Sequence, residues 1–230
     1  MPIARIASLA FVPAGSALAL GSSSASAGLR AELEDGKRST FLVATPDQPA
    51  LWAETEGFSF GAPVLFVRRL DRQTVADATQ AMAAEMGGYW LRYYNSSGEP
   101  SPAARAKKPR RGAARGVVKI VSTAVTEAYP PRSPDHGCGV SQVRIADGRE
   151  FSLLTATPSW FAKAFAEVGL VYFFGPSVLF VERLEPKLVR RAVSAMTADG
   201  DLWLCRYDTP RRTLPEVLSD FKTRHAAEFR

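Results

Sequence analysis

The two halves of this chain repeat one segment, and this repeat limits the fold more than any other feature. With the second half shifted by 112 residues, Asp35-Gly36 aligns with Asp147-Gly148, and an Ala-Thr-Pro triplet stands at both 44–46 and 156–158. After a two-residue insertion the shift becomes 114, and further segments match in the same order: Phe60-Gly61 with Phe174-Gly175, 64–67 with 178–181, Arg69-Leu70 with Arg183-Leu184, Ala81-Met82 with Ala195-Met196, and Arg92-Tyr93 with Arg206-Tyr207. Ordered matches across a whole unit predict a tandem duplication.

The first three strands of each copy are predicted from their apolar and β-branched residues and from the turns between them. The pattern gives strands at about 3–11, 29–34 and 39–45 in the first copy, and at about 117–125, 142–146 and 150–156 in the second. Asp-Gly follows the second strand in both copies. It favours a tight hairpin turn, because glycine adopts a positive φ without a steric penalty.

The rest of each copy is predicted to alternate helices and strands. Thr45-Pro46 and Thr157-Pro158 are typical helix starts, and Gly57 and Gly169 are typical helix ends. The expected order is helix 47–56, strand 62–68, helix 71–86 and strand 88–94, matched in the second copy by 159–168, 176–182, 186–198 and 201–207. Four consecutive apolar residues in 62–68 and in 176–182 predict strands that are buried on both faces.

The predicted fold class is therefore α+β, a tandem duplication of a β-β-β-α-β-α-β unit with mixed sheets. The second copy has an extra C-terminal helix at about 214–228, which Thr213 is expected to cap. The expected domains are residues 1–95 and 117–230, joined by a basic, disordered linker at 96–116.

Positive charge is concentrated in that linker. Residues 96–116 hold six basic side chains and one acid, whereas 1–95 hold eight basic and nine acidic residues, and 117–230 hold fifteen and thirteen. The basic residues of the linker are Arg105, Lys107, Lys108, Arg110, Arg111 and Arg115. Two interpretations remain open: a solvated tether, or a segment that contacts nucleic acid or an acidic protein.

The location of the protein is predicted from its cysteines and from its first residues. Two cysteines cannot form a disulfide framework, which favours a reducing, cytoplasmic location. Residues 1–27 also have the pattern of an export signal, which is the alternative. However, residues 5–8 align with 119–122 at the shift of 114, and this match predicts a strand at the start of both copies. No apolar run is long enough to predict a transmembrane helix, so no membrane partner is expected.

His136 and Cys138 are the residues whose side chains and spacing most resemble a reactive pair. A thiolate beside an imidazole is what a cysteine nucleophile requires. The segment is a loop rich in proline and glycine, however, and the first copy has neither group at the corresponding place. An incidental cysteine is the favoured interpretation, and catalysis by Cys138 and His136 is the alternative.

Metal and cofactor sites are not expected. His136, Cys138, Cys205 and His225 are all the histidines and cysteines of the chain, and their spacing lacks the paired ligands of zinc modules. Cys205 is interpreted as a buried thiol on a strand. The sequence contains no glycine-rich phosphate-binding motif, so no nucleotide cofactor is predicted.

Four arginines recur at matching positions of the two copies. Arg69 and Arg183 follow the central strands, where they can bind an anion or pair with a nearby acid such as Asp71 or Glu185. Arg92 and Arg206 lie in the aromatic segments 89–94 and 203–208. These segments can stack nucleic-acid bases, although aromatic packing into the core is the favoured interpretation.

The function expected from the sequence is that of a non-enzymatic binding or adaptor protein. Its two pseudo-symmetric repeats would present a composite surface to a protein partner, because the residues common to both copies are mostly fold-forming. A nucleic-acid-associated protein, which uses the basic linker and the Arg/aromatic strands, is one alternative. An enzyme with a Cys/His site in the second repeat is the other.

Overall fold

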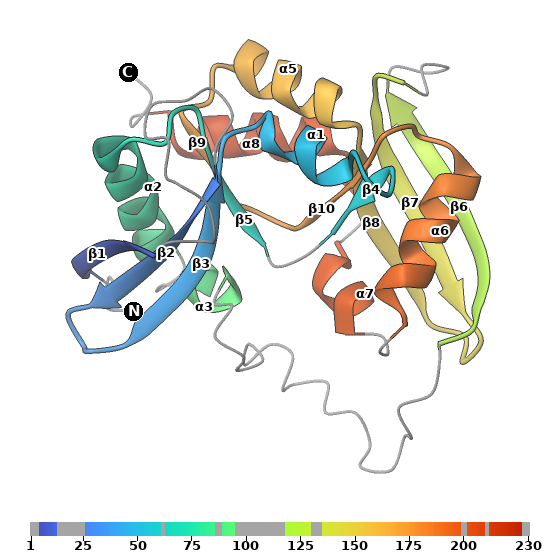
Figure 1. Cartoon of the computed structure of the whole chain (residues 1–230), viewed down its shortest axis with the longest axis horizontal. Coiled ribbons are helices and arrows are strands. Elements are labelled where there is room, and N and C mark those ends of the chain that lie inside the picture. Colours follow the sequence, from blue (N-terminus) through green and yellow to red (C-terminus); the bar gives the residue numbers. More distant parts are fainter. Residues whose placement is uncertain are drawn as a thin grey trace.

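Two mixed five-stranded sheets with helices packed around them form the structure, and each sheet is built mostly from one half of the chain (Figure 1). The computed structural model describes residues 5–12, 26–60, 63–85, 89–94, 118–129, 135–198, 202–209 and 212–226. The α+β class predicted from the sequence is confirmed. The basic segment 96–116 lies outside the described residues.

The first sheet contains four strands from the first half of the chain and one strand from the second half. Its order is β1 (Ile6–Val12), β2 (Ser26–Leu33), β3 (Arg38–Ala44), β5 (Val64–Val67) and β9 (Tyr172–Phe173). β1, β2 and β3 are antiparallel neighbours, and β5 runs parallel to β3. The predicted Asp-Gly turn joins β2 to β3, with Gly36 at φ +79°.

The second sheet has the same arrangement with the roles of the halves reversed. Its order is β6 (Ile120–Tyr129), β7 (Cys138–Ile145), β8 (Glu150–Ala156), β10 (Val178–Val181) and β4 (Phe58–Ser59). β10 runs parallel to β8, as β5 runs parallel to β3. β1 is therefore the edge strand of the first sheet, just as β6 is the edge strand of the second. It lies at the place where the sequence match predicted a strand.

The fifth strand of each sheet comes from the other half of the chain. Val67 pairs with Tyr172 across β5 and β9, and Val181 pairs with Phe58 across β10 and β4. These two pairs are related by the shift of 114 residues. Backbone hydrogen bonds continue both junctions: Arg68 N–H donates to the Val171 carbonyl at 2.7 Å, and Glu182 N–H donates to the Gly57 carbonyl at 2.7 Å. The two halves thus exchange strands reciprocally.

The first pair of helices follows the third strand of each half. α1 comprises Gln48–Ala53 and α5 comprises Pro158–Val168. Thr157 caps α5 by accepting a hydrogen bond from Trp160 N–H at 3.4 Å, as predicted. Thr45 does not cap α1, because that helix begins later, after Asp47 and with Pro49 in its first turn. Gly57 and Gly169 both have φ near +75° after the helices, in agreement with the predicted helix ends.

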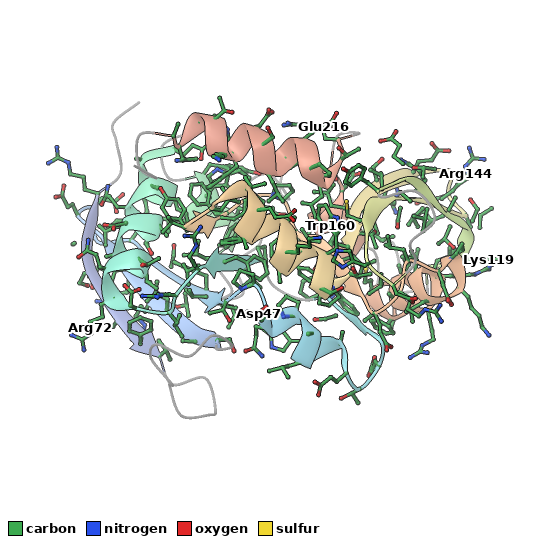
Figure 2. All side chains as sticks on the ribbon, turned by 90° about the horizontal axis from the view of Figure 1, so that it is seen from above. Asp47, Arg72, Lys119, Arg144, Trp160 and Glu216 are labelled. Atoms are coloured by element: carbon green, nitrogen blue, oxygen red, sulfur yellow. The ribbon has the colours of Figure 1, made fainter. Side chains whose placement is uncertain are left out.

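The second pair of helices, α2 (Arg72–Ala84) and α6 (Pro186–Met196), lies at opposite ends of the molecule (Figure 1). Asp71 caps α2 by accepting hydrogen bonds from Thr74 N–H at 2.8 Å and Thr74 Oγ1 at 2.9 Å. The additional helix of the second half, α8 (Leu214–Arg224), follows Thr213, whose N–H donates to Glu216 at 2.8 Å. It lies beside α5, as Figure 2 shows from above.

The predicted last strands, 88–94 and 201–207, are helices in the structure. α3 comprises Tyr89–Tyr94 and α7 comprises Leu202–Tyr207. In both, the buried side chains are three positions apart, Leu91 with Tyr94 and Leu204 with Tyr207, which is helical spacing. The predicted last strands therefore do not join the sheets, and the fifth strand of each sheet is β9 or β4 instead. Each half is therefore β-β-β-α-β-β-α-α, and not the predicted β-β-β-α-β-α-β.

The larger hydrophobic core contains residues from both halves of the chain. Phe66 of β5 is central to it, with its ring centroid 4.7 Å from that of Phe161 and 5.9 Å from that of Phe180. A second core lies between β7, β8, β10 and α6, and it includes Phe58 from the first half. No helix in the described part of the chain has the length and apolar character needed to cross a bilayer.

Cutting the chain within the basic segment should leave the two halves associated. We predict that a protease site inserted between Arg111 and Gly112 yields two fragments that coelute at the size of the intact 24.9 kDa chain in gel filtration. The reason is that each fragment contributes a strand and core residues to the other. Denaturant should separate the fragments. Two independently eluting, folded fragments without denaturant would contradict the exchanged arrangement.

Candidate functional site

A cavity of about 230 Å³ lies at the junction of the two halves. It is bordered by the paired strands β4 with β10 and β5 with β9, together with α1, α3 and α7. Its lining residues are Leu42, Trp52, Ser59, Phe60, Pro63, Val64, Phe66, Tyr94, Phe173, Pro176, Ser177, Val178, Phe180 and Tyr207. The cavity is thus composite, since neither half supplies it alone.

Corresponding positions of the two halves line this cavity. At the shift of 114 residues, Val64 aligns with Val178 and Phe66 aligns with Phe180, and all four residues line the cavity. Where the first half has Ser59, the second half has Phe173 at the matching position. The reciprocal strand pairing brings these positions together, because β4 and β9 cross into the opposite sheets.

The lining is uncharged. None of the described residues around the cavity is Asp, Glu, Lys, Arg or His. The Tyr94 hydroxyl accepts a hydrogen bond from Gly175 N–H at 2.8 Å and donates to the Gly175 carbonyl at 3.0 Å. Burial raises the pKa of Tyr94 above its ordinary value, so this phenol stays neutral. A surface of this kind favours uncharged, apolar groups.

Tyr93 ties the same region to the second half. Its hydroxyl donates to the Arg206 carbonyl at 2.6 Å and lies 3.2 Å from Ser177 Oγ. Burial raises the pKa of Tyr93 as well. The aromatic segment 89–94 therefore packs inward on a helix, with Leu91 and Tyr94 fully buried. The predicted strand at 88–94 is wrong, because Tyr89–Tyr94 is the helix α3, and base stacking by its aromatic residues stays a prediction.

The structure does not present Cys138 and His136 as a catalytic pair. Cys138 begins β7, and its side chain is 1% exposed within the larger core. Burial raises the pKa of the Cys138 thiol to about 12, so the reactive thiolate is scarce at neutral pH. His136 Nδ1 instead lies 3.2 Å from Ser159 Oγ.

Cys205 and the histidines are dispersed. Cys205 lies on α7 and is exposed, so the predicted buried thiol on a strand is wrong. The prediction failed because Leu204 and Tyr207, on the opposite side of the helix, occupy the core in its place. Among the described residues, no group of three or more His, Cys, Asp or Glu side chains could hold a metal ion.

Three of the four recurring arginines have side-chain interactions that the structure describes. Arg183 Nη1 lies 3.1 Å from Glu185 Oε1, and Arg183 Nε pairs with Asp135. The Thr74 N–H lowers the pKa of Asp71 most, and the charge of Arg69 lowers it further. The Arg206 guanidinium lies 5.2 Å from the Trp203 ring centroid.

These three arginines therefore interact with groups near them in the structure. Arg92 lies on α3, and its side chain is outside the described residues. The linker residues Arg105, Lys107, Lys108, Arg110, Arg111 and Arg115 are outside them as well, so contact between the linker and nucleic acid stays a prediction.

An ion-pair cluster joins the C-terminal helix to the first half of the chain. Glu85 follows α2, and its Oε1 pairs with Arg224 while its Oε2 lies 3.4 Å from His225 Nε2. The His225 ring centroid is 4.3 Å from that of Phe221. Burial raises the pKa of Glu85, but the interactions with His225 and Arg224 outweigh it and lower the pKa overall. No sequence signal indicates this cluster, because its members are 139 and 140 positions apart.

No protein-family model, curated protein or solved structure matches the chain significantly.

We predict that Glu85→Gln lowers the free energy of unfolding by about 1–2 kcal/mol at pH 7. A carboxylate whose pKa is depressed by folding stabilises the fold above its unfolded pKa, and this contribution is lost as the pH falls through the folded pKa. The difference from the wild type should therefore shrink at pH 3. Urea denaturation at both pH values measures it.

Glu167→Gln is the matched control for this prediction. Glu167 forms an exposed pair with Lys163 at 3.7 Å, and the substitution should leave the stability unchanged. A Glu85→Gln difference that stays constant between pH 7 and pH 3 would show that the charge of Glu85 does not stabilise the fold.

Proposed function

We propose that this chain is a non-enzymatic binding protein that holds a protein partner at the junction of its two halves. The observation that carries the proposal is the composite cavity, to which both halves contribute residues from corresponding positions. A partner bound there contacts both repeats at once, as a composite surface requires.

The backbone supports such a surface by holding the two sides of the cavity together. Val64 and Phe66 belong to β5, which pairs with β9 from the second half, while Val178 and Phe180 belong to β10, which pairs with β4 from the first half. Preorganised walls lower the ordering cost of binding, because fewer side chains and segments have to be fixed when the partner arrives.

The edges of the cavity are suited to contact with another protein. Leu42, Phe60, Val64 and Pro176 are each only partly buried at its margin. Partly exposed apolar side chains around a hollow form a surface that a partner can cover, and this burial stabilises the complex.

The enzymatic alternative has less support from the geometry. Its candidate nucleophile, Cys138, is a buried thiol whose pKa is raised. Exposed basic side chains such as Arg72 and Arg144 lie toward opposite ends of the molecule in Figure 2, and neither lines the cavity. They provide no charged substrate site at the cavity.

The test is capture of partners from native lysate, with and without nuclease, by the immobilised full chain. We predict that a Ser59→Phe variant loses at least about nine-tenths of the nuclease-resistant capture, because a ring at position 59 fills the cavity that a partner requires. The second half carries phenylalanine at the matching position, Phe173, so the strand pairing accommodates this residue type.

Ser8→Phe is the control for this experiment, because Ser8 is an exposed strand serine on β1 and does not line the cavity. It should capture as the wild type does. Equal capture by Ser59→Phe and Ser8→Phe would refute a binding role for the junction. Capture that disappears with nuclease would favour the nucleic-acid alternative.

A further inference from the structure

We infer that the junction cavity accepts one uncharged aromatic ring, carried by a side chain of the protein partner. This inference rests on the proposed function, because it specifies which group of the partner enters the site. It follows from the volume of the cavity, the charge of its lining and the nature of its margin.

The volume fits a single ring. An engineered cavity of roughly 150 Å³ with an apolar lining accepts benzene, whereas drug-sized ligands occupy pockets of about 300 Å³ or more. The junction cavity, at about 230 Å³, lies between these values. This volume suits one ring with its connecting carbon.

The lining selects against charge. Because no described lining residue carries a charge, a carboxylate or ammonium group would lose its hydration without gaining an ionic partner. Hydroxyl groups are present at Ser59 and Ser177, and Ser177 already contacts Tyr93 at 3.2 Å. These hydroxyls permit a phenol as well as a phenyl ring.

The surrounding rings favour an aromatic group over an aliphatic one. The Phe66 and Phe180 rings meet edge to face with their planes at 78°, and Tyr94 and Phe173 also line the space. Edge-to-face contacts with such rings add stabilisation to the burial of apolar area. Trp52 lies on α1 at the side of the first half.

The margin favours a ring attached to a protein over a free molecule. A free ring would leave the half-buried Leu42, Phe60 and Pro176 in contact with water. A ring presented on a protein surface buries these side chains together with itself. An anchor in a pocket, surrounded by weaker contacts that exclude water, is the usual anatomy of a protein interface.

The first part of the test uses small probes on the intact chain. We predict that toluene binds the wild type, that benzoate does not, and that Ser59→Phe weakens toluene binding by at least about tenfold, because the added ring removes the volume and apolar area that toluene would occupy. Ser8→Phe should bind toluene as the wild type does. Saturation-transfer NMR with a toluene titration measures each case.

Two results would overturn the inference at this stage. One is the absence of toluene binding to the wild type, and the other is benzoate binding as tightly as toluene. Both comparisons use the unmodified chain, so they hold even if Ser59→Phe fails to fold.

The second part separates this inference from the proposed function. Toluene at saturating concentration should release the captured partner from the wild type. If Ser59→Phe abolishes capture of the partner but toluene does not release it, the inference is overturned and the proposed function stands. Toluene binding without any capture of a partner would contradict the proposed function. It would also contradict the inference that the ring belongs to a protein partner. Only the preference of the cavity for an aromatic ring would then stand.

Discussion

Reciprocal pairing of two very short strands is the constraint on which the rest of this structure depends. β4 and β9 contain two residues each, yet they complete the sheets of the opposite halves through Phe58 with Val181 and Tyr172 with Val67. Unpaired backbone groups in these positions would be costly to bury. The exchange therefore ties the two halves together through the backbone, and side-chain packing around Phe66 follows from it.

The junction cavity is a consequence of this exchange. Because β4 and β9 cross between the sheets, positions that are equivalent in the repeat, such as Val64 and Val178, come to lie around one cavity. Tyr94 connects the same region to Gly175 from the other half. A Cβ atom at Gly175 would lie 2.8 Å from Phe173 Cζ, so a larger residue there would force this ring to shift. The described residues that line this cavity carry no charge.

The sequence predicted the features that depend on local chemistry. Asp35-Gly36 marked a hairpin, 64–67 and 178–181 marked central strands, and Thr157 marked the start of a helix, all of which the structure contains. It did not predict β4 and β9, because two-residue strands carry no periodic pattern and are stabilised by distant partners. The aromatic residues of these segments favour strands by propensity, whereas the structure has helices there, with Leu91 and Tyr94 buried three positions apart in the first. The cavity could not be predicted, since it exists only when the strands exchange.

The central claim is that each fifth strand comes from the opposite half, and backbone NOEs in the intact chain test it most directly. The account predicts cross-strand contacts between the α or amide protons of Val67 and Tyr172, and between those of Val181 and Phe58. If the strands stayed within their own halves, contacts would instead join Val67 to Phe58 and Val181 to Tyr172. Observing that second set of contacts would contradict the exchange, and with it the composite site.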